Sequence, residues 1–146
     1  MNRVVITGMG AWSCLGKNLD EVKNSLFEGK SGIFLDESRK ELGYRSSLTG
    51  KLERPQLKGL LDRRQRVGMG EPAEYAYMAT SEALKLAGIE MDFFDKNEVG
   101  IIYGNDSVAG STIEATDTIR AKKDTTLLGS GAIFQTMNCT VTMNLS

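Results

Sequence analysis

The sequence contains no histidine among its 146 residues. Histidine is the commonest general base near neutral pH, a frequent zinc ligand and the usual partner of a nucleophilic serine or cysteine. Its absence excludes every Ser-His or Cys-His pair and a typical zinc site. We therefore expect no catalytic residue, no metal and no cofactor in this chain.

Cysteine is also scarce, since Cys14 and Cys139 are the only two and lie far apart in the chain. A disulfide framework needs more, so the composition favours a reducing compartment and a cytoplasmic location. Either thiol could serve as a nucleophile if a base, a cation or a helix N-terminus activated it. Because histidine is absent and Cys139 is predicted to lie in the middle of a helix, we expect both cysteines to be buried, unreactive residues that only fill space in the core.

Long hydrophobic runs are missing as well. No stretch of about 18 apolar residues exists, so we expect no membrane span. Residues 4–15 are largely apolar and follow Arg3, as in a signal peptide, but Gly8 and Gly10 interrupt them and no cleavage pattern follows. A strand and a turn is the better interpretation. The net charge of -1 provides no basic field that would attract nucleic acid or an anionic membrane.

The remaining composition, 40% hydrophobic and 25% charged, is typical of a globular protein with one domain. β-Branched runs that end in glycine predict buried strands, and apolar residues at helical spacing predict helices. This order of elements indicates a layered α/β fold with a parallel sheet. The predicted strands are residues 4–7, about 46–50 and 99–103, and the predicted helices run from Asn18 to Gly29, from Pro72 to Gly88 and from about Ser111 to Lys123.

Residues 125–146 carry no charge at all. They are too rich in Thr, Asn, Gln and Ser for a membrane, and a half-polar helix of this kind suits a buried position against another chain or half-domain. The predicted strands and this helix do not complete a sheet. We therefore expect the chain to expose an unpaired strand edge or an apolar face, as a part of something larger would.

Two loops each allow two interpretations. Thr7-Gly8-Met9-Gly10 is similar to a dinucleotide-binding turn, but Ser13 stands where the third glycine belongs and the next helix begins only near Asn18. A tight turn is the favoured interpretation. The loop from Gly104 to Gly110 follows a predicted strand, where α/β folds place ligands, so a binding role and a plain connection are equally supported.

A basic cluster consists of Arg63, Arg64 and Arg66, with Arg54 and Lys58 upstream. From local sequence alone, a solvated face is the favoured explanation of such a run. The alternative is a docking site for a phosphate or an acidic partner, because the guanidinium fork suits both.

Several of these segments together resemble one family. Residues 4–10, the helix that ends at Gly29 and Ser31-Gly32-Ile33 resemble the opening of the β-ketoacyl-acyl-carrier-protein synthases, and residues 61–69 and 99–104 continue the likeness. Residues 31–50 look closer to the type I branch than to type II. The resemblance implies a thiolase-like fold, in which two similar α/β halves pack as five layers and pair into a dimer. Residues 1–146 would form a truncated N-terminal domain, a partial first half with a mixed, mainly parallel sheet.

The resemblance also implies an activity. Members of the family condense an acyl thioester with malonyl-acyl carrier protein and release carbon dioxide, in fatty-acid or related polyketide biosynthesis. In the family a cysteine carries the acyl chain, and two histidines and a lysine complete the site. That cysteine follows the segment similar to residues 135–146, so Cys139 is not expected to be the nucleophile and this chain alone should be inactive.

Other family roles can be assigned residue by residue. The resemblance places two residues in the loop beside the nucleophile and one at the dimer interface bordering the same pocket, and it matches Arg64 to a basic residue that meets the acidic helix of the carrier. The predicted acyl-pocket residues are Ser107, Val108 and Cys139, and the predicted carrier-binding residues are Arg63, Arg64 and Arg66.

The sequence departs from the family pattern at three places. Asn105-Asp106 stands where the family loop usually continues as Ser-Gly, Val67-Gly68 occupies a stretch that usually carries another arginine, and residues 129–132 replace a glycine-proline turn. These changes suit a divergent member that acts on an aryl-polyene or another secondary lipid.

Two other functions stay open at this point. The chain could be a non-catalytic scaffold that pairs with a separate ketosynthase subunit, or a small nucleotide-binding βα module. The ketosynthase interpretation predicts acyl carrier protein and acyl thioesters as partners and a homodimeric parent, without nucleic acid or a membrane span.

Overall fold

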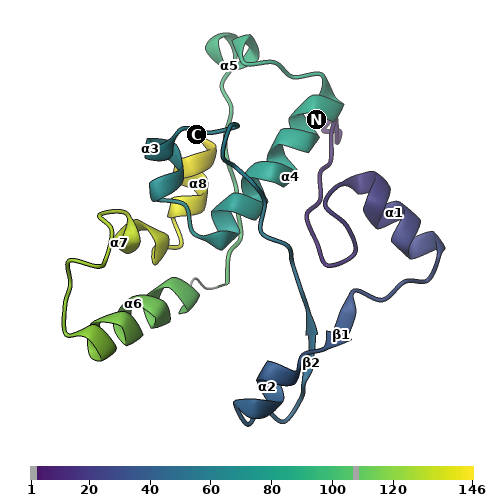
Figure 1. Ribbon diagram of the computed structural model, residues 1–146. Helices are drawn as coiled ribbons and strands as arrows, with labels where there is room; N and C mark the ends of the chain where they lie inside the picture. Colours follow the sequence, from purple (N-terminus) through teal and green to yellow (C-terminus); the bar gives the residue numbers. More distant parts are fainter. Residues whose placement is uncertain (1–2, 107–108) are drawn as a thin grey trace. The chain divides into compact units, whose positions relative to one another are not determined.

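The computed structural model describes residues 3–106 and 109–146, which divide into two units (Figure 1). Of the described residues, the first unit comprises 3–53 and 78–89, and the second comprises 54–77, 90–106 and 109–146. The elements that begin in the first unit are α1 (Leu19–Phe27), β1 (Ile33–Leu35), α2 (Glu37–Glu41) and β2 (Leu48–Gly50). Those that begin in the second unit are α3 (Arg63–Val67), α4 (Glu71–Ala87), α5 (Asp92–Lys96), α6 (Ala109–Lys122), α7 (Ala132–Gln135) and α8 (Thr140–Leu145).

The predicted helix after Asn18 is present as α1. The Asn18 side chain accepts a hydrogen bond from the Glu21 N–H at 2.9 Å and so caps the helix. Glu21 reaches back to the Lys17 N–H and to the Asn18 side-chain amide, not to the Asn18 backbone that a regular capping box would use. Gly29 adopts a φ of +63°, the left-handed conformation that ends the helix where the sequence indicated.

A two-stranded antiparallel hairpin follows α1. β1 pairs with β2 in the register Ile33 opposite Gly50, and α2 lies in the connection between them. The short strand predicted near residues 46–50 is thus confirmed, whereas β1 and the antiparallel pairing were not foreseen. The Cys14 Sγ lies beside the start of this hairpin, 2.7 Å from where a Cβ on Gly32 would stand, so a side chain at that position would clash with Cys14.

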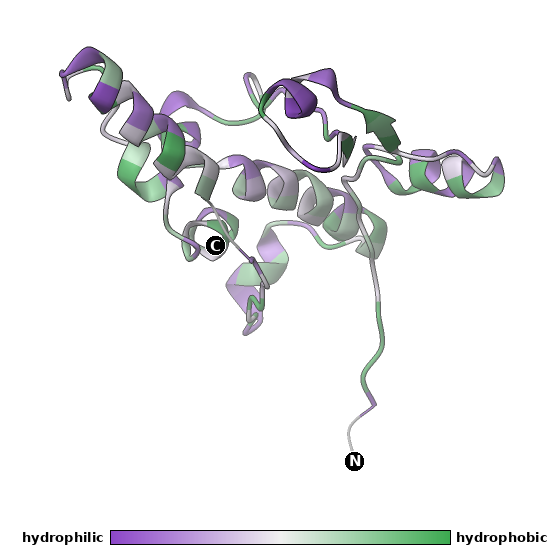
Figure 2. Cartoon of the chain, turned by 90° about the horizontal axis from the view of Figure 1, so that it is seen from below, coloured by the Kyte–Doolittle hydropathy of each residue, from purple (hydrophilic) through white to green (hydrophobic). Residues whose placement is uncertain are grey.

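The N-terminal strand predicted at residues 4–7 is not formed. Within the described residues this segment has no strand beside it, and Val4 and Ile6 are 92% and 84% exposed. Its hydrophobic residues stand out in the trace near the N-terminus (Figure 2). The glycines that follow have a packing role instead, because a Cβ on Gly8 would lie 2.1 Å from the Ala83 carbonyl oxygen and one on Gly10 would lie 1.9 Å from that of Ala79.

Glu82, on α4, holds the loop between these glycines and α1. One carboxylate oxygen accepts the Ala11 N–H at 2.9 Å, and the other accepts the Leu19 N–H at 2.8 Å. Leu19 is the first residue of α1, so its N–H has no partner within the helix. One half-buried carboxylate therefore fixes both ends of the loop.

The fully buried hydrophobic side chains of the described residues all lie in the second unit. They come from the segment before α3, from the turn before α4, from the start of α4 and from α8, and they are Leu57, Met69, Ala73, Ala76 and Val141. Pro72 occupies the first turn of α4, as expected from its missing N–H, and Gly88 closes that helix with a φ of +66°.

The second predicted strand, residues 99–103, is also not formed. It runs as an extended segment in which Ile102 is fully exposed and Val99 is 51% exposed. The parallel sheet expected from these two segments is therefore absent from the part of the chain that the structure describes, because a β-branched run becomes a strand only when a neighbouring strand satisfies its backbone. The sequence predicted an exposed strand edge or an exposed apolar face, and the structure shows exposed apolar residues along these extended segments.

The charge-free C-terminal segment is not one buried helix. It forms α7 and α8, separated by a turn, and only Gly131, Thr140 and Val141 in it are buried. The Thr140 hydroxyl donates to the Phe134 carbonyl and closes the turn. Cys139 lies at the N-cap of α8 and is exposed, so the expectation of a buried mid-helix thiol is wrong there.

The remaining helix prediction is close to the structure, because α6 covers most of residues 111–123, and Lys123 leaves it with a φ of +53°. Among the described helices, none has both the length and the apolar character needed to span a bilayer.

Candidate functional site

The three arginines predicted as a docking site lie on α3. A capping box begins this helix, in which the Asp62 carboxylate accepts the Gln65 N–H at 2.8 Å and the Gln65 side chain accepts the Asp62 N–H at 2.9 Å. The carboxylate of Asp62, the acidic residue next to the arginines, is therefore hydrogen-bonded to the helix backbone. Arg63 and Arg64 are exposed, so their guanidinium groups are accessible to a partner.

Arg66 is partly committed to the backbone. Its Nε donates to the carbonyl oxygens of Leu61 and Asp62, each at 3.2 Å, and the residue is half-buried. The three arginines are therefore brought together by one helix but are not equivalent. Arg63 and Arg64 provide the accessible charge, and Arg66 contributes with its orientation fixed.

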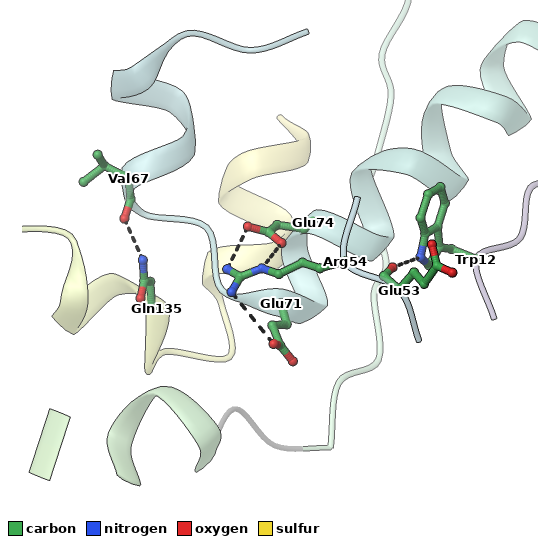
Figure 3. Close-up of polar contacts among 7 residues, drawn as sticks. All are labelled: Trp12, Glu53, Arg54, Val67, Glu71, Glu74 and Gln135. Atoms are coloured by element: carbon green, nitrogen blue, oxygen red, sulfur yellow. Dashed lines mark hydrogen bonds and ion pairs between the residues drawn. The ribbon is translucent and has the colours of Figure 1, made fainter. Parts of the chain in front are cut away.

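Arg54 does not belong to this basic face. Its Nε and a terminal nitrogen donate to the Glu74 carboxylate at 2.6 and 2.9 Å, and Glu71 lies 3.9 Å away (Figure 3). The hydrogen bond to Glu74 raises the pKa of Arg54 above its ordinary value. A two-pronged pair of this kind neutralises the guanidinium, so Arg54 links the segment before α3 to the start of α4.

An open groove lies beside the arginine helix in the second unit. Its apolar lining includes Val67, Phe134 and Met143, and its polar lining includes Arg64 and Asn144. α3, α7 and α8, which supply most of this lining, are drawn together in Figure 1. A groove that combines an accessible arginine with an apolar floor can receive an acidic partner that also carries an apolar side chain.

The predicted acyl-pocket residues are not brought together by the described structure. Ser107 and Val108 lie outside the described residues. Cys139 is exposed at the start of α8, and it does not line the groove beside α3. Their assignment to an acyl pocket stays a prediction.

The turn after residue 7 does not have the geometry of a phosphate cradle. Gly8 and Gly10 press against the α4 backbone, and the first free amides of α1 are taken, that of Leu19 by Glu82 and that of Glu21 by Asn18. A nucleotide phosphate needs such amides unoccupied. Across residues 3–106 and 109–146, no cluster of three or more Cys, Asp or Glu side chains could hold a metal ion.

Several contacts between distant residues of the described chain could not be predicted from the sequence, and three of them matter most here. They are the Glu82 bonds to the loop before α1, the Arg54–Glu74 pair, and a bond from the Gln135 side chain to the Val67 carbonyl oxygen at 3.0 Å. The partners in the third are 68 positions apart. No local pattern points to contacts between residues so distant in sequence.

Comparisons with known proteins give a consistent result. A family model described as "Beta-ketoacyl synthase, N-terminal domain" matches residues 1–146. A 3-oxoacyl-[acyl-carrier-protein] synthase 1 from Haemophilus influenzae is 33% identical over 147 residues, which cover 100% of this chain and 36% of that protein. The protein of the same name from Escherichia coli K12 is 37% identical over 106 residues, which cover 72% of this chain and 26% of that protein.

A solved structure is similar as well. The crystal structure of a β-ketoacyl synthase from Burkholderia phymatum aligns with a TM-score of 0.83 at 28% identity, over 100% of this chain and 36% of that chain. This match confirms the predicted fold class, a partial thiolase-like α/β fold. The chain spans between 26% and 36% of the length of these relatives.

Proposed function

Because the chain belongs to the β-ketoacyl synthase family, we propose that it is the N-terminal domain of a 3-oxoacyl-[acyl-carrier-protein] synthase. The whole protein would condense an acyl thioester with malonyl-acyl carrier protein and release carbon dioxide, in the synthesis of fatty acids or of a related secondary lipid such as an aryl polyene. The 33% identity along the full chain carries this proposal. The whole protein would be cytoplasmic and homodimeric.

The chain would contribute binding surfaces and no reacting groups. It has no histidine to polarise a thioester carbonyl, and neither of its cysteines has a histidine to activate it. The nucleophilic cysteine, the two histidines and the lysine would come from the rest of the enzyme. Ser107, Val108 and Cys139 would line the acyl pocket there.

Docking of the carrier is proposed for α3. Arg63 and Arg64 are exposed, and the nearest acid in sequence, Asp62, is engaged in the helix cap. An acidic carrier helix would be attracted electrostatically, and the attraction would weaken as salt screens it. Arg54 and Arg66 would contribute less, because one is paired and the other is bonded to the backbone.

The activity is tested on a whole enzyme that contains this sequence. We expect malonyl-dependent condensation by the intact protein and none by residues 1–146 alone. Arg64→Glu should weaken carrier binding at low salt and leave binding at high salt nearly unchanged, whereas Lys40→Glu, an exposed residue of α2, should change neither. Equal losses at both salt concentrations would contradict electrostatic docking.

A second candidate function is a scaffold that pairs with a separate ketosynthase polypeptide. The exposure of Val4, Ile6 and Ile102 favours it, because these apolar segments need a covering surface. Co-expression of the chain with a ketosynthase polypeptide that lacks the matching region should then give a stable complex. Separate elution of the two would eliminate this function.

A further inference from the structure

α3 is too short to hold its own orientation. It has five residues, and an isolated helix of that length is unstable in water. Its N-terminal end is closed by the Asp62–Gln65 capping box. Its C-terminal end has carbonyl groups without partners in the helix, and it ends at Gly68 in a right-handed conformation rather than a left-handed glycine cap.

Residues from α7 and the turn before it close this second end. The Gln135 Nε2 donates to the Val67 carbonyl oxygen at 3.0 Å, and Figure 3 shows the two groups facing each other. The Gly131 backbone lies so close that a Cβ there would stand 2.1 Å from the same oxygen. A Cβ on Gly70 would in turn stand 3.0 Å from the Gln135 carbonyl oxygen.

These contacts have a consequence for the arginines. Arg64 lies one helical turn before Val67 and lines the groove together with Phe134 of α7 and Met143 of α8. The direction of the Arg64 guanidinium therefore depends on the position in which these contacts hold the C-terminal turn of α3. Gly131 lies in residues 129–132, the stretch that replaces the family's glycine-proline turn, and its lack of a side chain permits the close approach to Val67.

We propose that Gln135 is a positioning residue for the basic helix α3, acting through its hydrogen bond to the Val67 carbonyl. The proposal rests on the proposed docking function of that helix. Gln135 touches no partner itself. It fixes the end of the helix whose exposed arginines would meet the acidic carrier, and it ties that helix to the segment leading into α8.

The test compares three substitutions in the intact enzyme that contains this sequence. Gln135→Met keeps the length of the side chain but has no N–H, Gln135→Lys keeps a donor beside the negative end of α3, and Asn138→Ala changes an exposed amide nearby. The protection of the α3 amides is measured by hydrogen exchange. The affinity of the enzyme for the carrier is measured with holo-acyl carrier protein as the probe.

We expect Gln135→Met to lower the protection of the α3 amides and the carrier affinity by roughly two- to tenfold, the range of one net hydrogen bond. The salt dependence of binding should stay unchanged, because both exposed arginines remain. Gln135→Lys should retain protection, and Asn138→Ala should match the wild type. Unchanged α3 protection in Gln135→Met would overturn the proposal. Absence of carrier binding by the wild type would instead refute the docking function, and α3 protection would still decide the role of Gln135.

Discussion

At the scale of single residues, similar ion pairs in this chain have different surroundings. Arg54 forms a two-pronged pair with Glu74, whose side chain is only 12% exposed. Lys17 pairs with Glu53, and these side chains are 45% and 69% exposed. A carboxylate that loses its partner while shielded from water is destabilised, whereas an exposed one is hydrated at once.

Arg54→Met should therefore destabilise the fold by about 1 kcal/mol. The reason is that Glu74 would keep its charge without its partner. Lys17→Met is the matched control and should leave stability almost unchanged. Urea unfolding followed by circular dichroism measures both, and equal effects would show that burial of Glu74 does not matter.

The two cysteines should differ in reactivity. Cys139 is exposed, whereas Cys14 is half-buried with its Sγ against the hairpin glycines. We expect a thiol reagent such as DTNB to label Cys139 several-fold faster, because access limits the reaction of ordinary thiols. The single-cysteine variants Cys14→Ser and Cys139→Ser assign the two phases. Faster labelling of Cys14 would contradict the described packing.

At the scale of elements, local caps decide where helices begin and end. Asn18, Asp36 and Asp62 each accept a backbone N–H at the start of a helix. Gly29 and Gly88 adopt positive φ angles at helix ends. These devices are local, so most of them could be found by pattern. The carboxylate of Glu82, which holds the start of α1 from another helix, could not.

Glu82→Ala should release the loop between Ala11 and Leu19. Two backbone N–H groups would lose a charged acceptor, and we expect a loss of about 2 kcal/mol in stability. Glu82→Gln, which keeps one acceptor oxygen, should lose less. Amide exchange at Ala11 and Leu19 should accelerate in both variants. The control is Asp20→Asn, at an exposed position of α1, which should leave exchange at these two amides unchanged. Unchanged exchange at both amides in the Glu82 variants would show that Glu82 does not hold this loop.

The cap of α2 should depend on pH. The Ser38 hydroxyl and N–H hold the pKa of Asp36 below its ordinary value. A lowered folded-state pKa means that the stabilisation is complete above the unfolded-state value and disappears as pH falls through the folded-state value. The Ser38 amide resonance should therefore shift with acidification below about pH 4, the ordinary range of aspartate. Asp36→Asn should abolish this shift, and a shift at neutral pH would contradict the assignment.

At the scale of the whole molecule, the described chain exposes much apolar surface. Val4, Ile6 and Ile102 are more than 80% exposed. All of its fully buried hydrophobic side chains lie in one of its two units. A chain with this surface should associate through its extended segments when no covering polypeptide is present.

Residues 1–146 alone should therefore bind the dye ANS and show concentration-dependent association. Ile6→Lys combined with Ile102→Lys should reduce both, because charge on an extended segment opposes strand pairing. Leu42→Lys, an exposed position in the connection after α2, is the control and should have little effect. Analytical ultracentrifugation gives the association state, and a monomer that binds no dye would refute the prediction.

The sequence alone determined the family, the main helices and the positions of their caps, because these depend on short patterns that neighbouring residues complete. It also located the basic cluster and the apolar segments, but not the helix α3 that carries the cluster. Tertiary structure decided that Arg54 is paired with Glu74 and does not join the accessible arginines. It also formed the Glu82 bonds and the Gln135–Val67 bond, which join residues distant in sequence. It also decided that residues 4–7 and 99–103 are not strands, because a strand needs a neighbour to accept its backbone hydrogen bonds, and no run of residues contains its own partner.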